Sequence, residues 1–254
     1  MINFNINKNN SLMALEELVK QNINTKLSYM PDSFNQQQHH ALELFKQRLF
    51  LEKTIDEAIS FNKSLVFPNE NKNLHITTTA EDLIDVFKLR SDVYTSINYQ
   101  DEFPDIIEGL NFDKYDNHSA IFFYRNNGIV TGTIRVISDF YKKFPSEDKF
   151  SCDFLREEYS SVVEISRIII QKETKGLNLE FKYLVRGHYY FLINNDIDIT
   201  IFSIKKEHYK LYSKFGGITI LKELDTYGTF DMTCLVISWD TSKVSKFFKR
   251  AFLS

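Results

Sequence analysis

Residues 161–171 read SVVEISRIIIQ, and this β-branched run decides the fold. A continuous apolar run of this length is typical of a strand buried on both faces of a sheet. Glu164 and Arg167 interrupt the run. Because buried charges are costly unless they are paired or have a task, their placement favours a functional site over a structural salt bridge.

Strand and helix patterns alternate around this segment. Asn127-Gly128 tolerates the positive φ angles of a tight hairpin between two of the predicted strands. Further strands are predicted at residues 74–78, 120–125, 129–138, 198–204 and 232–239, and helices from Thr79 to about Ile97 and over residues 177–194 and 207–214. The order predicts an α/β (α+β) fold with a mixed, mostly antiparallel central sheet and flanking helices.

The first 73 residues differ from the rest of the chain in their pattern of apolar residues. Apolar residues recur at helical spacing over residues 12–19 and again over 42–59, which predicts two amphipathic helices. The polar stretch NQQQHH (35–40) is expected to connect them, and residues 67–75 are expected to form a linker. We therefore predict a helical N-terminal extension over residues 1–73 and a second domain over residues 74–254.

Composition narrows the classes of function. The net charge of -3 gives no overall attraction to phosphate backbones, so no nucleic-acid partner is expected. Cys152 and Cys234 are the only cysteines, which favours neither a disulfide framework nor a zinc site, and no metal is expected. The sequence has no apolar signal region and no transmembrane window, so we expect a cytoplasmic protein. The common nucleotide, serine-hydrolase and zinc-protease motifs are also missing.

Other charged residues stand at positions that allow two interpretations. Arg90 lies on the apolar stripe of the helix after the first strand, either with its guanidinium reaching water or as a buried cation that needs a carboxylate. Asp113 and Asp116 form either a solvated turn or a paired acidic site for a cation. Arg135 faces away from the more apolar side of its strand, either as an exposed strand arginine or as part of a site with the other charged residues.

Four short motifs in this order resemble those of the acyl-homoserine-lactone synthases and the long-chain N-acyl amino acid synthases, within the Gcn5-related N-acetyltransferase fold. The motifs are Arg90-x-x-x-Tyr94, Asp113-x-x-Asp116, Gly132-Thr-Ile-Arg135 and Glu164-Ile-Ser-Arg167. HYKLYSKFGG (208–217) is also similar to a segment of the wider fold, in which Tyr212 takes the position facing the leaving thiolate. This segment and the N-terminal extension favour the amino acid synthase branch.

The resemblance implies an N-acyltransferase that moves a fatty acyl group from a thioester to the amine of an amino acid or a related small molecule. Glu164 would be the base, Tyr212 the acid, and Arg167 would join them as a catalytic residue. Glu164 and Arg167 would point to opposite faces of a regular strand, so the resemblance also implies a β-bulge. The acceptor would be held by Arg90, Tyr94, Asp113, Asp116 and Arg135, and the donor by Ile168, Ile170, Lys175, Gly176, Leu177 and Asn178.

The donor is the point at which this sequence departs from the pattern. The loop that binds the pyrophosphate of coenzyme A in the wider fold aligns with Glu173-Thr-Lys-Gly176-Leu-Asn178, with an acidic residue first and Asn last. This weakens the case for coenzyme A, but both coenzyme A and an acyl carrier protein stay open as the source of the acyl thioester. The acidic surface of a carrier protein would suit Lys172, Lys175, Lys182 and Arg186. These four residues also fit an ordinary solvated helix start.

Alternatives of other classes stay open at this point. A lactone synthase would use S-adenosylmethionine as acceptor, and a non-catalytic member of the fold would bind a small molecule or a partner. The basic C-terminal segment SKVSKFFKRAF (242–252) either packs on the domain or makes a weak contact with a membrane surface or a carrier protein.

Overall fold

A computed structural model describes residues 32–67, 71–139, 143–171, 178–226, 228 and 232–254. The chain divides into two compact units, Met1–Asp56 and Glu57–Ser254. The second unit contains the sheet and all of the predicted site residues. The boundary that the sequence places near residue 73 stays a prediction.

A seven-stranded mixed sheet forms the centre of the second unit, in the order β1-β2-β3-β4-β5-β7-β6. Its strands are β1 (Leu74–Ile76), β2 (Ser119–Asn126), β3 (Ile129–Ser138), β4 (Val162–Ile170), β5 (Ile199–Lys205), β6 (Ile218–Leu224) and β7 (Cys234–Trp239). Among the strands in the described residues, β4 and β5 alone pair in parallel, and the other neighbours pair in antiparallel fashion. The predicted fold class is confirmed, although β6 was not predicted.

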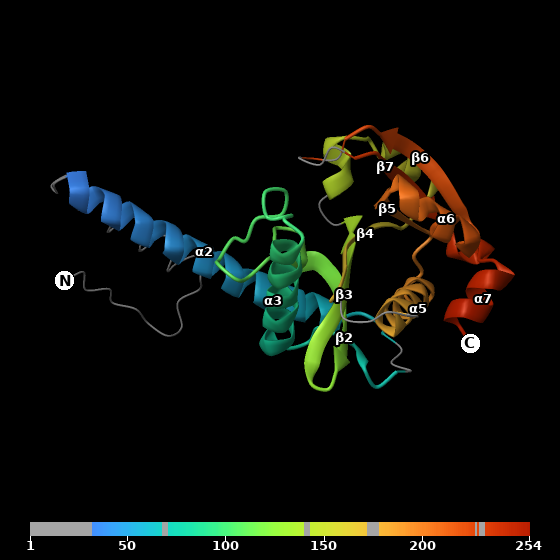
Figure 1. Cartoon of the computed structure of the whole chain (residues 1–254), viewed down its shortest axis with the longest axis horizontal. Coiled ribbons are helices and arrows are strands. Elements are labelled where there is room, and N and C mark those ends of the chain that lie inside the picture. Colours follow the sequence, from blue (N-terminus) through green and yellow to red (C-terminus); the bar gives the residue numbers. More distant parts are fainter. Residues whose placement is uncertain (1–31, 68–70, 140–142, 172–177, 227, 229–231) are drawn as a thin grey trace. The chain divides into compact units, whose positions relative to one another are not determined.

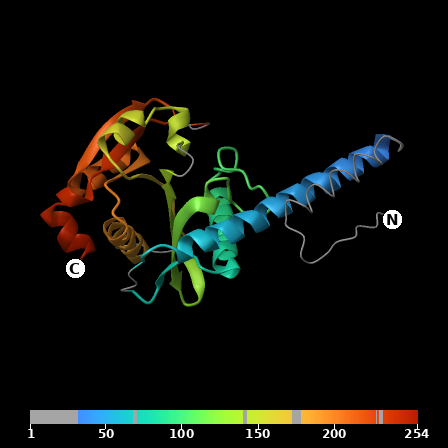
Figure 2. The same ribbon diagram turned by 180° about the vertical axis from the view of Figure 1, so that it is seen from behind.

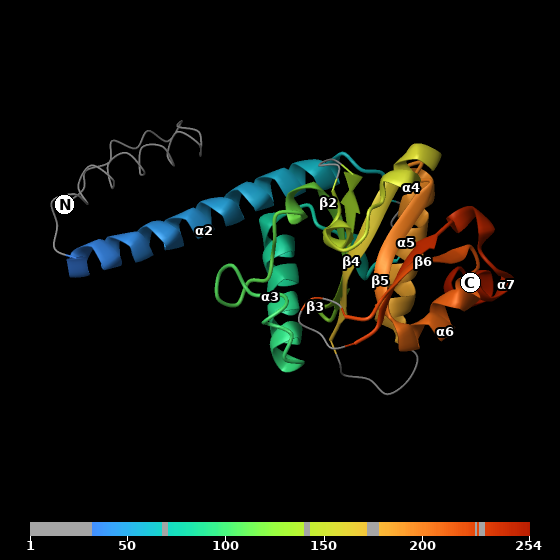
Figure 3. The same ribbon diagram turned by 90° about the horizontal axis from the view of Figure 1, so that it is seen from above.

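The helices are α2 (Asp32–Lys63), α3 (Ala80–Ser96), α4 (Asp153–Glu158), α5 (Leu179–Asn194), α6 (Tyr209–Tyr212) and α7 (Lys246–Phe252). Helix α3 packs on β3 and β4, whereas α5 packs on β1, β2 and β3. Figures 1 and 3 show α3 and α5 on opposite sides of the sheet. The sheet therefore has an α3 face and an α5 face.

The α5 face carries the larger apolar core. Its strand residues alternate with those of the other face, as the period of two requires. Buried members of this core include Phe122, Ile134, Val163, Leu184 and Phe202. Burial of this face fixes the register, and hence the side chains that the same strands present to α3.

The hairpin between β2 and β3 forms where the sequence predicts it. Asn126 pairs with Ile129 across a two-residue turn. Asn127 and Gly128 both adopt positive φ, at 49° and 83°. These angles match the right-handed twist of the flanking strands, which explains the Asn-Gly pair.

Helix α2 differs from the prediction for the N-terminal segment. The stretch over residues 35–40, expected as a connection, is helical and continues into the predicted second helix. Gln and His allow helix, and no Gly or Pro interrupts the run. The first predicted helix, over residues 12–19, lies outside the described residues.

The end of α2 belongs to the second unit and is hydrogen-bonded to the sheet. The Asn62 side chain donates to the Ser119 carbonyl at 3.0 Å and accepts from the Ile121 amide at 3.1 Å. Beyond the helix, the Phe67 ring stacks on Phe122 at 5.0 Å. Part of the predicted linker therefore packs as core.

Helix α7 closes the other end of the sheet and lies beside α5 (Figure 2). Phe248 and Phe252 are buried against Phe215, and Trp239 packs on Phe248. Packing on the domain is thus the interpretation of the C-terminal segment that the structure supports. In the described part of the chain, no helix has both the length and the apolar character needed to cross a bilayer.

Candidate functional site

Helix α3 carries a fully buried arginine toward the sheet. Thr79 caps the helix by accepting from the Asp82 amide, which sets the phase of the stripe. Arg90 has no exposed surface, and its Nη1 donates to Asp116 Oδ1 at 2.8 Å. Of the two interpretations of Arg90, the buried cation with a carboxylate is the one observed. Ile97, at the predicted end of the helix, is 41% exposed.

The two aspartates bring the other predicted side chains together. Arg135 Nη1 lies 2.6 Å from Asp113 Oδ1 and 3.1 Å from Asp116 Oδ1. Arg167 donates to Asp113 Oδ2 and to the Tyr94 hydroxyl, each at 3.0 Å. The acidic pair is therefore an ionic site, with Asp116 fully buried and Asp113 25% exposed, and not a solvated turn. We call this set the charge cluster: Arg90, Tyr94, Asp113, Asp116, Arg135 and Arg167.

The charge cluster carries a surplus of positive charge, because three guanidinium groups face two carboxylates. Burial opposes ionisation of Asp113, but Arg135 and Arg167 outweigh it and hold the pKa of Asp113 well below its usual range. Burial also lowers the pKa of Arg90, against the attraction of Asp116. Both aspartates form ion pairs with the arginines and are therefore not available to act as bases.

A β-bulge in β4 aims Arg167 into this cluster. Ile169 pairs with Thr133 and Ser166 pairs with Arg135, so two β4 residues face a single β3 residue between them. Arg167 takes up the extra length with φ of 53°, the left-handed conformation that non-glycine residues rarely adopt. The bulge implied by the resemblance is confirmed, and it forms at Arg167 without a glycine.

Glu164 lies on the same face of β4 as Arg167 and is almost completely buried. It is 2% exposed and accepts two hydrogen bonds on Oε2, from the Ser146 amide at 3.1 Å and its hydroxyl at 2.7 Å. Burial raises the pKa of Glu164 to about 7, although the Ser146 hydrogen bonds and Arg135 act in the opposite direction. A carboxyl with this pKa exchanges protons readily near neutral pH.

A small cavity of about 240 Å³ joins Glu164 to the charge cluster, and we call it the inner chamber. Its polar side chains come from β3, β4, β5 and the loop between α3 and β2, and its aromatic side chains come from α3 and that loop. The lining includes Tyr94, Tyr99, Phe103, Asp113, Arg135, Glu164, Ser166, Arg167, Ser203, Lys205 and Cys234.

A larger cavity of about 1290 Å³, the outer groove, lies beside the inner chamber and shares Tyr94, Arg167 and Lys205 with it. It forms where β4 and β5 diverge, because their paired residues end at Ile165 and Phe202. The outer groove is lined further by Ile168, Ile170, Asn178, Phe181 and Tyr212.

Tyr212 lies on α6 in the wall of the outer groove. Its ring packs between Phe181, Phe202 and Phe215, with centroids 5.3 to 6.5 Å apart. Burial raises the pKa of Tyr212 to about 12, so the phenol stays protonated at neutral pH. A protonated phenol in this position has a proton to donate.

The predicted pyrophosphate loop is described only at its end. Lys175, Gly176 and Leu177 lie outside the described residues, as does Lys172. Asn178 caps α5 by accepting from the Phe181 amide at 2.8 Å. The amino terminus of a 16-residue helix therefore opens onto the outer groove, where its dipole favours an anion.

Two of the basic residues expected to meet a carrier protein are engaged within the chain. Lys182 Nζ donates to the backbone oxygen of Ser254 at 3.1 Å. Arg186 donates to the backbone oxygens of Phe252 and Ser254. These contacts hold the segment after α7 against α5, which gives both residues a structural role.

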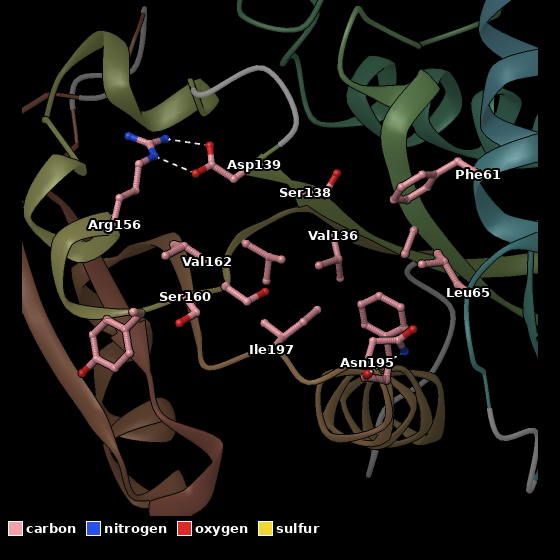
Figure 4. A pocket seen from close by; sticks show the side chains of 15 residues that line it. Phe61, Leu65, Val136, Ser138, Asp139, Arg156, Ser160, Val162, Asn195 and Ile197 are labelled. Atoms are coloured by element: carbon pink, nitrogen blue, oxygen red, sulfur yellow. Dashed lines mark hydrogen bonds and ion pairs between the residues drawn. The ribbon is translucent and has the colours of Figure 1, made fainter.

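Another cavity, of about 760 Å³, lies at the start of β4, away from the bulge (Figure 4). Apolar side chains such as Phe61, Val136 and Ile197 line it. Arg156 at its edge forms a bidentate pair with Asp139, at 2.7 and 2.9 Å, and a further pair with Glu147. Its charges are thus paired internally, and none of the predicted site residues lines this cavity.

Several residues of the site were not predicted from the sequence. Ser146 binds Glu164, Ser166 accepts from Arg135 Nε at 2.8 Å, and the Arg167 guanidinium lies 4.3 Å from the Phe103 ring centroid. Lys205 lines both cavities. Only Ser166 stood within a motif, so the others carried no local signal. No group of His, Cys, Asp and Glu placed to hold a metal occurs among the described residues.

A bulged β4 that diverges from a parallel β5, between helices on both faces, defines the Gcn5-related N-acetyltransferase class of fold. Three solved structures share it: FeeM, an N-acyl amino acid synthase from uncultured soil microbes, the AHL synthase LasI, and the CoA-dependent acyl-homoserine lactone synthase MesI. Their TM-scores are 0.53, 0.54 and 0.53, at 16%, 14% and 14% identity. The matches cover 71%, 70% and 71% of this chain and 94%, 93% and 95% of theirs.

At these identities the structures establish the fold alone, and no curated protein sequence matches the chain. The family profile of the N-acyl amino acid synthase FeeM matches residues 85–240, which is more than half of the chain. The chain therefore belongs to the FeeM family of N-acyl amino acid synthases. The predicted class of activity, an acyltransferase acting on an amine, is confirmed at the level of the family.

Proposed function

We propose that the chain transfers a fatty acyl group from a phosphopantetheine thioester in the outer groove to the amine of an amino acid in the inner chamber. The observation that carries this proposal is Glu164, a buried carboxyl with a pKa of about 7 that lines the inner chamber. The volumes agree with a small acceptor beside a long donor.

Glu164 takes the role of base. The nitrogen of the neutral acceptor amine attacks the thioester carbonyl, and as the C–N bond forms Glu164 takes one proton from this nitrogen, directly or through one water. The forming C–N bond leaves the electron pair of the carbonyl on its oxygen. Collapse of this tetrahedral species breaks the C–S bond and gives an amide and a thiolate.

Backbone amides of β4 suit the oxyanion. The Gln171 amide donates to the Thr131 carbonyl of β3 at 2.8 Å. Since alternate amides of a strand point to the same edge, those of Ile168 and Ile170 point to the opposite edge, where β5 has diverged. Two such donors would stabilise the charge that develops on the carbonyl oxygen.

Tyr212 completes the cycle by giving its proton to the departing thiolate. In the charge cluster, Arg90 and Arg135 are engaged with Asp113 and Asp116, so we assign them to positioning. Arg167 is held by Tyr94 and Asp113 and forms part of the wall shared by the inner chamber and the outer groove. The groups of the acceptor that touch this wall are then presented to Glu164.

The identity of the donor is the finer part of the proposal. Coenzyme A and acyl carrier proteins both present a phosphopantetheine thioester, and BjaI and MesI are described as CoA-dependent synthases. The α5 amino terminus at the groove suits a phosphate of either one. Because Lys182 and Arg186 are engaged within the chain, we propose an acyl-CoA donor.

The test uses the purified full chain with acyl-CoA or an acylated carrier protein, and with amino acids or S-adenosylmethionine as acceptor. Free thiol and N-acyl product are measured together, by absorbance and mass spectrometry. We expect an N-acyl amino acid with acyl-CoA. A lactone formed from S-adenosylmethionine, or product only with the carrier protein, would correct the acceptor or the donor.

The base assignment predicts a pH profile. Since Glu164 must be deprotonated to act, kcat/KM should rise as the pH increases through about 7. Glu164→Gln should lower kcat by about 10²- to 10⁴-fold and remove this limb. Glu157→Gln, on the exposed side of α4, is the matched control and should retain both. A Glu164→Gln protein with full turnover and the same pH limb would contradict the assignment of Glu164 as the base.

A further inference from the structure

Lys205 is a cation on the face of the sheet that carries Glu164, and it takes no part in the chemistry proposed above. Glu164 pairs with Ile201 in the parallel ladder, so their side chains share a face. Two and four residues along β5, Ser203 and Lys205 return to that face. Lys205 lines both the inner chamber and the outer groove, at their junction.

The cations of the inner chamber differ in their partners. Arg135 is paired with both aspartates of the charge cluster, and Arg167 is paired with Asp113. Lys205, by contrast, has no carboxylate within ion-pair distance among the residues that the structure describes. Its neighbour Lys206, by comparison, forms an ordinary surface ion pair with Glu223 at 2.5 Å.

The Lys205 side chain is held in place by an aromatic neighbour. Its ammonium lies 5.8 Å from the ring centroid of Tyr99. A hydrogen bond with Tyr99 raises the pKa of Lys205, and the group remains a cation near neutral pH. Tyr99 in turn stacks on Tyr94 of the charge cluster at 6.5 Å. The cation thus lines the chamber, and no anion among the described residues pairs with it.

We propose that Lys205 binds the carboxylate of the acceptor, so that the enzyme selects amines carrying a carboxylate over neutral amines. This inference rests on the proposed function and adds the residue that recognises the acceptor class. The charge cluster already has a surplus positive charge, and an anionic ligand between it and Lys205 would compensate both.

The register of the strands is consistent with this arrangement. Lys205 lies four residues beyond Ile201, the partner of Glu164, which is about 13 Å along the strand at ~3.3 Å per residue. Both side chains are long and line the same chamber. An amino acid between them would face its amine toward Glu164 and its carboxylate toward Lys205.

The test compares an amino acid with its α-carboxamide as acceptor, at a saturating acyl-CoA concentration. Lys205→Met should raise KM for the amino acid by about 10- to 100-fold, as expected for the loss of a charged hydrogen bond, and leave KM for the donor unchanged. The α-carboxamide should bind weakly to both proteins with nearly equal KM. Lys205→Arg should restore most of the loss, and Lys206→Met is the matched control.

The outcomes separate this inference from the proposed function. A Lys205→Met protein that loses affinity for the donor, or for acid and amide equally, would overturn the role of Lys205 while acyl transfer stands. If the native chain transfers no acyl group to any amine, the proposed function fails. Binding is then measured by thermal shift with amino acid and amide, and equal shifts in the native chain and Lys205→Met would overturn the inference independently.

Discussion

At the residue scale, the site depends on how each charge is compensated. Arg90 and Asp116 both have 0% exposed side chains, and such a pair persists only because each partner offsets the desolvation of the other. Glu164 has no cation at contact distance among the described residues and receives only neutral donors from Ser146. This difference explains why its pKa is raised while that of Asp113 is lowered.

Removing one charge of the buried network should be strongly destabilising. Asp116→Asn keeps the shape of the side chain but leaves Arg90 as a buried cation without its carboxylate. We expect the free energy of unfolding to fall by about 3 to 5 kcal/mol, measured by urea denaturation.

The matched control is Arg125→Met, since Arg125 pairs with Asp82 and Asp85 near the surface. It should cost about 1 kcal/mol or less. Equal losses for the two variants would contradict the difference in burial.

At the element scale, β4 is the strand on which the site is built. Its first half pairs with β5, and its second half, beyond the bulge, diverges to leave an open edge. A regular strand would place Glu164 and Arg167 on opposite faces, and continued pairing would fill the groove. The extra residue thus aims Arg167 into the inner chamber, and the end of β4–β5 pairing leaves the outer groove open.

The turn before β6, the strand that was not predicted, offers a test of packing. Gly217 has φ of 71°, and a Cβ there would lie 2.1 Å from the Asp240 carbonyl oxygen of the neighbouring backbone. Gly217→Ala should therefore lower the free energy of unfolding by more than the roughly 1 to 3 kcal/mol of left-handed strain.

Gly128→Ala is the control for strain alone. Gly128 has φ of 83°, but a Cβ added there would meet nothing within 4 Å. Thermal melts of both variants should show a larger loss at Gly217. Equal losses would mean that the β6 turn does not approach β7 as described.

At the scale of the whole molecule, the second unit begins before the predicted domain. Asn62 satisfies backbone groups of Ser119 and Ile121, and Phe67 stacks on Phe122, all of them in or beside β2. A chain cut at the boundary predicted from composition would leave these groups without partners.

We expect a fragment that begins at Glu57 to fold, and one that begins at Leu74 to be less stable. Each buried backbone group left unsatisfied costs about 1 to 3 kcal/mol, and the loss of Phe67 packing adds to this. Circular dichroism melts of the two fragments and the full chain measure the difference. Equal stability of the two fragments would favour the boundary near residue 73.

Much of the fold follows from local patterns in the sequence. The hairpin at Asn127-Gly128 between β2 and β3 and the α3 cap at Thr79 depend on interactions within a few residues, so they were predictable. β6 was missed because it is a half-exposed edge strand whose pattern is weak without its partner. Arg90 and Arg167 were identifiable because charge within an apolar stripe or strand is costly. The other members of the charge cluster, Tyr94, Asp113, Asp116 and Arg135, were identified through the resemblance of their motifs.

The sequence by itself determined the order of strands and helices and the charges of Glu164 and Arg167 within an apolar strand. Only the tertiary structure decided that Arg90 and Arg135 are neutralised by the aspartates, that Glu164 is not, and that Lys205 reaches the same chamber from β5. The reason is physical: compensation of a charge depends on distance and burial, and both are set by strands and loops far apart in the sequence.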